Sequence, residues 1–472
     1  MLEFIVPFNN SKPKYLQLYD YIKHEIIENQ MKLGSKLPSS RMLSTHLGVS
    51  RNTILSAYEL LLAEGYIVSR QKSGYYVTEQ LDIAFMKPPN NKSTVHQDPV
   101  PLKKDIYEID FKYGHIDRRN FPYKAWKTAL TRCLPPKHTS SSDYGNKQGE
   151  LPLRRVLSEY IYRSRGVHCT PEQIVITSGT QMSLDHICRL THDKFSSVAM
   201  ENPGYIGGKV IFELNNVDVL PIHLKKDGID MDELTQSKCK LALVTPSHQF
   251  PLGMTMSVSK RIEVLKWANE VNGYIIENDY EGEFSHSGQP IASLQSYDNN
   301  ERVIYLYNFS GSLLPGARMS FYVLPNSLIP HYQNTLGLIE QSVPVYQQNA
   351  LEDFILSGEW EKHIRRMRKI YKSKHVVLRN AINTYFGKSV EPIGNAVGLH
   401  LLLRVHNGMD ENTLIETALV AGVKVYTTSQ FWIDAKKIDT ALVLIGFGNT
   451  TNEEITKGIA LLKHAWFGNT SS

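Results

Sequence analysis

One short segment of the sequence has the residue types that bind a phosphate group. Ser178, Gly179 and Thr180 follow an apolar run, Ile174–Thr177, and stand at the start of a helical pattern. Backbone N–H groups and hydroxyls at the N-terminus of a helix bind anions, because the helix dipole is positive there. Taken alone, such a segment is more often a plain turn between a strand and a helix, where Ser and Thr serve as caps. A phosphate site here is a hypothesis that needs support from other segments.

A second segment, near the N-terminus, has residue types that suit DNA. Ser50 stands where a helix N-cap is expected, and Arg51, Asn52 and Thr53 follow it. Arg51 could contact guanine or a phosphate, Asn52 a base edge, and Thr53 a phosphate or the methyl group of thymine. These side chains would read an operator if the helix that they open lies in the major groove.

The elements around this segment are predicted in a recognisable order. Apolar residues recur at helical spacing from Tyr15 to Ile26, and two further helices are expected over Arg41–Leu47 and Arg51–Glu64. Two β-rich runs, Tyr66–Val68 and Tyr75–Val77, flank a turn that contains glycine, which predicts a hairpin. This is the order of a winged helix-turn-helix, which places its second motif helix in the major groove of DNA.

Three further basic residues extend the predicted DNA-binding surface. Arg41 begins the first motif helix and is placed for a phosphate, while Arg70 and Lys72 at the hairpin tip can reach the minor groove or the backbone. The alternative is a small structural domain whose basic residues are merely solvated, but helix spacing, turn residues and hairpin agree with one another. We therefore expect double-stranded operator DNA to be bound by Arg41, Ser50, Arg51, Asn52, Thr53, Arg70 and Lys72.

Length and composition describe an ordinary folded chain. The 472 residues are 42% hydrophobic and 21% charged, which excludes a mainly disordered, collagen-like or coiled-coil protein. The net charge of +5 does not imply nucleic acid by itself, so the DNA-binding prediction depends on the motif. Neither a signal peptide nor an apolar run of about 18 residues is visible, which favours a cytoplasmic protein without a membrane span.

The four cysteines and 17 histidines show no metal-binding spacing. No CxxC or HExxH pattern occurs, so we expect neither a disulfide framework nor a metal site. Free cysteines fit a reducing compartment.

The sequence predicts three parts along the chain. The winged helix-turn-helix covers residues 11–79, and residues 80–107, with four prolines, have the composition of a linker. In residues 108–472 short apolar strands alternate with helical segments, which predicts a large α/β domain with a mostly parallel sheet. The strand candidates are Ile174–Thr177, Ser197–Met200, Val217–Leu220, Leu241–Thr245, Tyr274–Glu277, Val303–Tyr307 and Met319–Leu324.

Both parts carry motifs that resemble known families. The N-terminal part, residues 11–79, is called the head. It resembles the GntR-type winged helix through Leu37-Pro38-Ser39, Val49-Ser50-Arg51-Asn52-Thr53 and Glu64-Gly65-Tyr66. The C-terminal part, residues 108–472, is called the body, and it is similar to the fold type I aminotransferase (PLP-transferase) domain. The segments that carry this similarity are Tyr144-Gly145, Glu201-Asn202-Pro203-Gly204-Tyr205, Thr245-Pro246-Ser247-His248-Gln249-Phe250-Pro251, Asn278-Asp279-Tyr280 and Phe309–Arg318. The combination resembles the MocR/GabR subfamily of GntR-type transcription regulators.

The resemblance implies a pyridoxal phosphate (PLP) pocket that serves as a sensor, in a head-to-tail homodimer. The phosphate would be held by Ser178, Gly179, Thr180 and Arg318, and by Tyr144 from the partner subunit. Tyr205 would stack on the ring, while Tyr280, with His248 or Gln249 nearby, would face the ring hydroxyl. The residues that the resemblance assigns to the pocket are Tyr144, Ser178, Gly179, Thr180, Tyr205, Gln249, Asn278, Tyr280, Ser310 and Arg318.

The chain also departs from the family at four positions. The lysine that forms the Schiff base with PLP is replaced by Gly311, seven residues before Arg318, so no covalent link can form there. Asn278 stands where an acid pairs with the pyridine nitrogen, although a slip of one residue would give that role to Asp279. In GABA-responsive members two arginines bind the amino-acid carboxylate; here the corresponding segments contain Ile206-Gly207 and Gln430.

Three functions remain open at this point. A transcription regulator whose body senses an effector and mediates dimerisation, without transamination, is favoured. A working aminotransferase that also binds DNA is opposed by Gly311, since that lysine also shuttles the substrate proton. The third is a regulator whose body senses a non-amino-acid ligand or a protein. Apart from these three functions, the pocket could serve only as a dimerisation scaffold. One isolated change to glycine could be accidental, but four coincident losses indicate divergence from amino-acid chemistry. PLP held non-covalently, or another phosphorylated ligand, remains compatible with the phosphate residues.

Overall fold

The computed structural model describes residues 6–9, 12–28, 30–79, 107–134, 144–285, 291–394, 397–434 and 441–468. The chain divides into two units, Met1–Lys104 and Asp105–Ser472, and each is described by itself. The predicted linker, 80–107, lies outside the described residues except for its last position.

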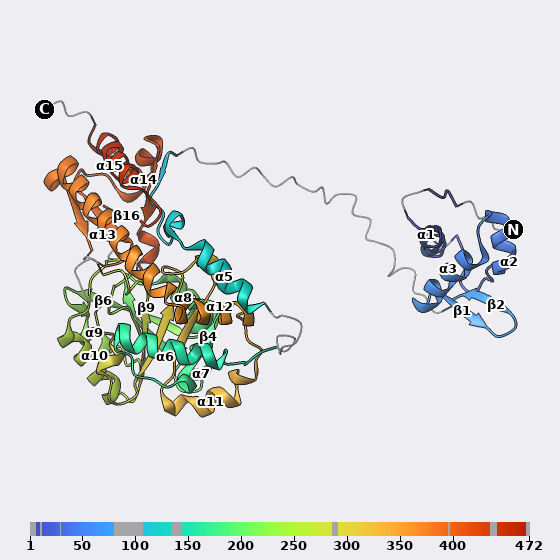
Figure 1. The fold of residues 1–472 in the computed structure, drawn as a ribbon, viewed down its shortest axis with the longest axis horizontal. Helices are drawn as coiled ribbons and strands as arrows, with labels where there is room; N and C mark the ends of the chain where they lie inside the picture. Colours follow the sequence, from blue (N-terminus) through green and yellow to red (C-terminus); the bar gives the residue numbers. More distant parts are fainter. Residues whose placement is uncertain are drawn as a thin grey trace. The chain divides into compact units, whose positions relative to one another are not determined.

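The first unit is a small helical head closed by a hairpin (Figure 1). Its core joins α1 to α3 through buried residues such as Leu18, Ile22 and Tyr58. The predicted elements are confirmed, with ends shifted by a few residues. They are α1 (Lys14–Ile27), α2 (Ser40–Leu47), α3 (Arg51–Ala63) and an antiparallel hairpin of β1 (Ile67–Arg70) and β2 (Gly74–Val77).

The second unit is built around an eight-stranded sheet that contains all seven predicted strands. The strand order is β4-β11-β10-β9-β8-β5-β6-β7. The strands from β10 to β6 are parallel, as predicted, whereas β11 and β7 run antiparallel to their neighbours. The strands are β4 (Ile174–Thr177), β5 (Ser197–Asn202), β6 (Asp218–Lys225), β7 (Gly228–Ile229), β8 (Leu241–Val244), β9 (Tyr274–Asp279), β10 (Val303–Asn308) and β11 (Ser320–Val323).

Helices cover both faces of this sheet, which explains why several of its strands, such as β8, are apolar throughout. In β10, Tyr305 and Tyr307 pack into one core cluster with α6 and α13, while Ile304 and Leu306 pack into another with α7 and α8. The helices of this layered part are α5 (Tyr123–Cys133), α6 (Leu151–Arg165), α7 (Thr180–Thr191), α8 (Ile206–Leu214), α9 (Met231–Gln236), α10 (Val258–Glu270), α11 (Ile329–Asn334), α12 (Val345–Leu356) and α13 (Glu359–Phe386).

A second, antiparallel sheet follows the long helix α13. Its strand order is β12-β13-β16-β15, and a short parallel pair, β3 with β14, ties the start of the unit to this end of the chain. The elements are β3 (Ile109–Asp110), β12 (Val390–Ile393), β13 (His400–Val405), α14 (Glu411–Val420), β14 (Val423–Lys424), β15 (Tyr426–Thr427), β16 (Leu442–Gly446) and α15 (Asn452–Phe467). Among the described residues, no helix has both the length and the apolarity needed to cross a membrane.

Candidate functional sites

The start of α3 presents the residues that were predicted to read DNA. Ser50 caps the helix, because its Oγ accepts the backbone N–H of Thr53 at 3.1 Å and lies 2.8 Å from the Thr53 hydroxyl. The side chains of Arg51 and Asn52 are exposed. Arg51 Nε donates to Ser40 Oγ at 3.3 Å, so the arginine crosses from α3 to the first turn of α2. The two motif helices are thereby joined at the face that carries the predicted contacts.

The hairpin tip carries the two basic residues predicted for the wing. Lys72 is exposed and has a positive φ of 60°, as its position in the turn requires. Arg70 pairs with Glu79 at 2.8 Å and lies over the ring of Tyr76, 4.5 Å from its centroid. Exposed ion pairs contribute little free energy, so a phosphate could replace Glu79 at small cost.

The second unit contains a cavity of about 250 Å³ at the carboxyl ends of the central strands. This is where open α/β sheets bind their ligands. Asn278 and Asn308 come from β9 and β10, while Thr180 starts the helix after β4. The cavity is lined by Tyr113, Thr180, Tyr205, Ile206, Phe250, Asn278, Tyr280, Asn308 and Phe431.

The alternation of side chains along β9 decides which of two neighbouring residues faces this cavity. Asn278 lines it. Asp279 points to the other side, where it is fully buried and accepts two hydrogen bonds from Arg165, at 2.7 and 2.9 Å, and one from Tyr305 at 2.6 Å. The cavity therefore meets a neutral amide at this position, and the carboxylate serves an internal ion pair.

Groups of the kind that bind a phosphate lie next to Thr180 and Asn308 of the cavity wall, although Ser178, Gly179 and Arg318 are not themselves among the lining residues. Arg318 Nη2 donates to the backbone oxygen of Ser178 at 3.2 Å, so the guanidinium lies against the turn that begins α7. Gly179 has φ 110° and ψ 163°, and a Cβ placed there would be 2.3 Å from Arg318 Nη2. Asn308 Nδ2 donates to Thr180 Oγ1 at 2.8 Å, which orients the threonine hydroxyl. A helix start, a hydroxyl and a guanidinium are groups with which proteins bind anions.

Two polar atoms at the cavity wall lack partners within the described part of the chain: Asn278 Oδ1 and the Tyr280 hydroxyl. Both are buried, and an unpaired buried polar atom costs about 1–3 kcal/mol. Burial raises the pKa of Tyr280 well above its ordinary value, so the hydroxyl keeps its proton and can donate. Aromatic walls, two polar atoms and the neighbouring anion-binding groups fit a phosphorylated aromatic ring with polar substituents.

The same cavity lacks an amine. None of the described residues that line it is a lysine. Gly311 is not among the lining residues, and a Cβ placed on it would be 3.1 Å from Cγ of Glu281. No arginine stands at either position expected for a carboxylate, since Ile206 and Phe431 line the cavity there and Gln430 is exposed. The residues fit the ring and phosphate of PLP without a covalent bond at position 311.

The remaining predicted pocket residues lie elsewhere. Gln249 is buried away from the lining, and its Nε2 donates to the backbone oxygen of Pro203 at 2.9 Å. Ser310 is not among the lining residues; its backbone N–H donates to Oδ1 of Asn308 at 2.8 Å. Tyr144 is 84% exposed, as a residue that acts on a partner subunit would be in one chain. His248 stacks on Tyr280 from outside the cavity, with ring centroids 5.4 Å apart.

Sequence reasoning missed several residues of the cavity wall: Tyr113, Phe250, Asn308 and Phe431. Phe250 and Phe431 stand inside segments that the family resemblance used, and Asn308 directly precedes one of them. Tyr113 had no signal, because an aromatic residue after a two-residue strand is indistinguishable from ordinary core.

Comparison with known proteins agrees with the two parts of the chain. Residues 14–77 match the family of bacterial regulatory proteins of gntR type, and residues 110–459 match class I and II aminotransferases. The chain is 42% identical to the uncharacterized HTH-type transcriptional regulator YhdI of Bacillus subtilis (strain 168), over 98% of both chains. It is 30% identical to the probable rhizopine catabolism regulatory protein MocR of Rhizobium meliloti, over 98% of this chain and 95% of that one.

A solved structure shows the fold of the second unit alone. Kynurenine aminotransferase of Pyrococcus horikoshii matches with a TM-score of 0.70 and 24% identity, over 78% of this chain and 93% of that one. Fold, motifs and relatives define a class: DNA-binding proteins that join a winged helix-turn-helix to an aminotransferase-like domain. The chain belongs to the MocR/GabR subfamily of GntR-type transcription regulators, which confirms the resemblance inferred from its motifs.

Proposed function

We propose that the aminotransferase-like domain of this DNA-binding regulator is an effector-sensing and dimerisation module that carries out no transamination. The observation that carries the proposal is the cavity itself, with its aromatic wall, the phosphate-binding groups next to it and a glycine at position 311. Transamination needs an amine at that position to hold the coenzyme and to move the substrate proton. The cavity can therefore bind without catalysing.

The ligand that suits the cavity is PLP held non-covalently, or another phosphorylated ring. When bound, PLP would supply an electron-withdrawing ring and an aldehyde. Arg318 and the turn at Ser178–Thr180 would hold its phosphate, and Tyr280 would donate to its ring hydroxyl. The neutral amide of Asn278 would face the ring nitrogen. It can accept or donate a hydrogen bond there, but it cannot stabilise a positive charge on the ring as a carboxylate does.

Ligand binding could reach the DNA-binding heads through the parts of the chain that the cavity joins. Phe250 and Tyr280 follow strands of the central sheet, whereas Tyr113 follows β3 and Phe431 follows β15 of the second sheet. A ligand that contacts both groups would favour one arrangement of the two sheets. In a head-to-tail homodimer such a population shift would change the spacing of the two heads on their half-sites.

Reaction with borohydride tests the absence of covalent chemistry. The full chain is incubated with PLP, reduced and analysed by intact mass and peptide mapping. We expect no pyridoxyl group near residue 311, and stabilisation against heat by PLP if it binds non-covalently. Gly311→Lys is the matched gain-of-function variant, expected to acquire one adduct at residue 311. An adduct near 311 in the unmodified chain would contradict the proposal, and absence of any binding by phosphorylated rings would favour the scaffold alternative.

Selection from random duplexes, followed by gel shift, tests the DNA-binding surface. Arg51→Ala should abolish sequence-specific binding while the oligomeric state, measured by sedimentation, stays the same. Arg155→Ala, an exposed arginine of α6, is the control for loss of one positive charge and should bind as the unmodified chain does. Retained specific binding by Arg51→Ala would defeat the assignment of this helix to the major groove.

A further inference from the structure

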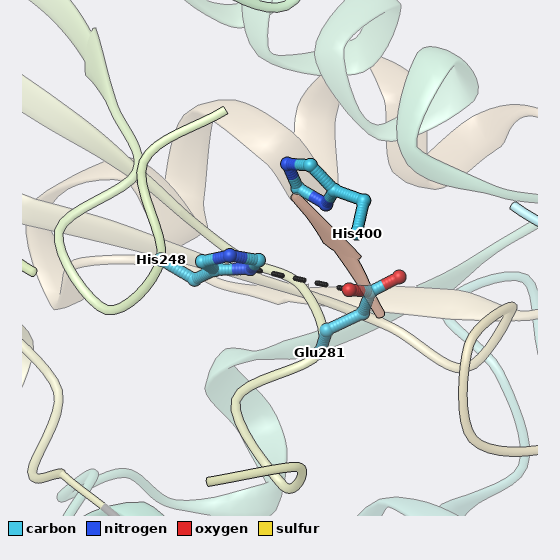
Figure 2. A group of neighbouring side chains, drawn as sticks. All are labelled: His248, Glu281 and His400. Atoms are coloured by element: carbon cyan, nitrogen blue, oxygen red, sulfur yellow. Dashed lines mark ion pairs between the residues drawn. The ribbon is translucent and has the colours of Figure 1, made fainter. Parts of the chain in front are cut away.

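Two histidines and one glutamate from three distant segments meet outside the ligand cavity. His248 follows β8, Glu281 follows β9, and His400 begins β13 of the second sheet. Figure 2 shows the three side chains beside one another, with the ion pair between His248 and Glu281 as a dashed line. One possible ligand atom of each lies within 4.8 Å of those of the other two, and His248 Nδ1 is 3.9 Å from Glu281 Oε2. All three residues are buried.

The tautomer of His400 is fixed by its surroundings. Its Nε2 lies 2.9 Å from the backbone oxygen of Pro251, which can only accept, so Nε2 carries the proton. Nδ1 then holds a lone pair, and this buried atom has no hydrogen-bond partner within the described residues. A neutral imidazole whose second nitrogen donates to a carbonyl is the usual form of a metal-bound histidine.

The backbone around the cluster is shaped to bring these side chains together. Gly398 has a φ of 80°, and a Cβ placed there would lie 1.9 Å from Cε1 of His248, so only glycine leaves room for the ring. Glu281 adopts a positive φ of 55° although it has a side chain. Its Oε2 accepts the backbone N–H of Leu399 at 2.9 Å, which anchors the carboxylate to the second sheet.

From this geometry we propose that His248, Glu281 and His400 form a binding site for one divalent transition-metal ion, with Zn²⁺ as the best match. Two imidazoles and one carboxylate are a common protein ligand set for zinc, with bonds of about 2.0–2.2 Å and room for a fourth ligand. A tetrahedral ion at that distance brings its ligands about 3.3 Å apart, so the three atoms would move inward by about 1.5 Å at most.

Binding would also compensate a buried acid. Glu281 is buried, and buried charged groups in proteins are paired or coordinate metals, so a cation beside this carboxyl group would supply a partner. Sequence reasoning could not find this site, because its three residues are 33 and 119 positions apart, far outside any motif spacing.

The site would join the central sheet to the second sheet directly behind the effector cavity. His248 stacks on Tyr280, and Tyr113 packs edge-on against His400 with centroids 4.8 Å apart. Both tyrosines line the cavity. An ion held here would therefore fix two of its walls, and the buried ligands imply slow exchange of the metal.

Direct metal binding by the full chain tests the proposal. Chelator-treated protein is incubated overnight with Zn²⁺ or Co²⁺ at pH 7.5, and free metal is set by a competing chelator. We expect one tightly bound ion per chain, a rise in melting temperature, and visible Co²⁺ bands of a nitrogen and oxygen site without a thiolate charge-transfer band. A folded chain without a tight site, or a thiolate band from one of its four cysteines, overturns the proposal.

Two substitutions separate this site from the other histidines. His400→Gln should weaken Zn²⁺ binding by about 100-fold or more, since even loss of a partner outside the ligand shell costs 10–100-fold. His363→Gln is the matched control: His363 is also buried and its Nε2 lies 2.8 Å from the backbone oxygen of Ser312, but it belongs to no such cluster among the described residues. Equal Zn²⁺ affinity in the two variants overturns the assignment of the ligands. If His400→Gln fails to fold, the number of bound ions per chain and the Co²⁺ spectrum of the unmodified chain test the proposal instead.

Discussion

Substitution of Gly179 by alanine is the sharpest test of the proposed phosphate-binding groups. The φ of 110° and ψ of 163° at Gly179 lie in a region that only glycine adopts readily. A methyl group there would also sit 2.3 Å from Arg318 Nη2, so the guanidinium would have to move away from Ser178. Gly179→Ala should therefore both strain the turn and displace the arginine that is expected to hold the phosphate.

The two contributions can be estimated separately. Backbone strain of this kind destabilises the folded state by about 1–3 kcal/mol. The lower conformational entropy of the unfolded chain with alanine offsets about 0.4–1 kcal/mol of this, so the net destabilisation is about 1–2 kcal/mol. Displacing the hydrogen bond from Arg318 to Ser178 costs about 0.5–1 kcal/mol more, because this arginine is exposed. We expect Gly179→Ala to lower the free energy of unfolding by about 1.5–3 kcal/mol in total.

Tryptophan fluorescence during urea unfolding measures this change in the body alone, since all five tryptophans lie beyond residue 107. In an Arg318→Ala background only the strain should remain, so the effect of Gly179→Ala should shrink by about 0.5–1 kcal/mol, beyond the usual deviation from additivity. Gly316→Ala is the control, in the loop that carries Arg318, where a Cβ meets nothing within 4 Å. Equal effects in both backgrounds, or an equally large effect of Gly316→Ala, would refute the placement of Arg318 against Gly179.

Two further predictions concern buried charge. Lys374→Met should destabilise the body by about 3 kcal/mol in the same unfolding assay, because Lys374 Nζ donates to Asp117 Oδ2 and to the backbone oxygen of Gly448, each at 2.7 Å, and the side chains of Lys374 and Asp117 are buried. Lys372 is exposed on the same helix, so Lys372→Met should change the free energy of unfolding by no more than about 0.5 kcal/mol. Similar losses in the two variants would contradict the estimate. Burial lowers the pKa of His363 to about 4, below that of an unfolded histidine, so the unfolded chain binds the extra proton and stability should fall by up to about 3 kcal/mol as the pH drops from about 6.5 to 4. His363→Gln should flatten that part of the stability curve, and an unchanged slope would show that other groups cause it.

The layered core of the body was predictable from the sequence, whereas the second sheet was not. Strands buried on both faces are apolar at every position, so runs such as Ile174–Thr177 and Val303–Tyr307 stood out. The two-residue strands β3, β14 and β15 are too short to show any periodicity. Their existence depends on partners distant in the sequence.

The ligand cavity was predictable in its motifs but not in its orientation. The sequence could not decide between Asn278 and Asp279, because a shift of one residue along a strand exchanges its two faces. The ion pair of Asp279 with Arg165 fixes that register in the structure. The cluster of His248, Glu281 and His400 illustrates the same limit, since only the tertiary fold brings its members together.

The energetics of the cavity wall bear on whether the domain is a sensor or only a scaffold. Asn278 Oδ1 and the Tyr280 hydroxyl are buried without partners among the described residues, and each costs about 1–3 kcal/mol in that state. A domain retained only for dimerisation would lose nothing by replacing these two residues with apolar ones of similar size. A ligand that accepts from Tyr280 and pairs with Asn278 removes both penalties on binding. The polar wall therefore favours a pocket that still meets a ligand, while Gly311 limits what the pocket can do to it.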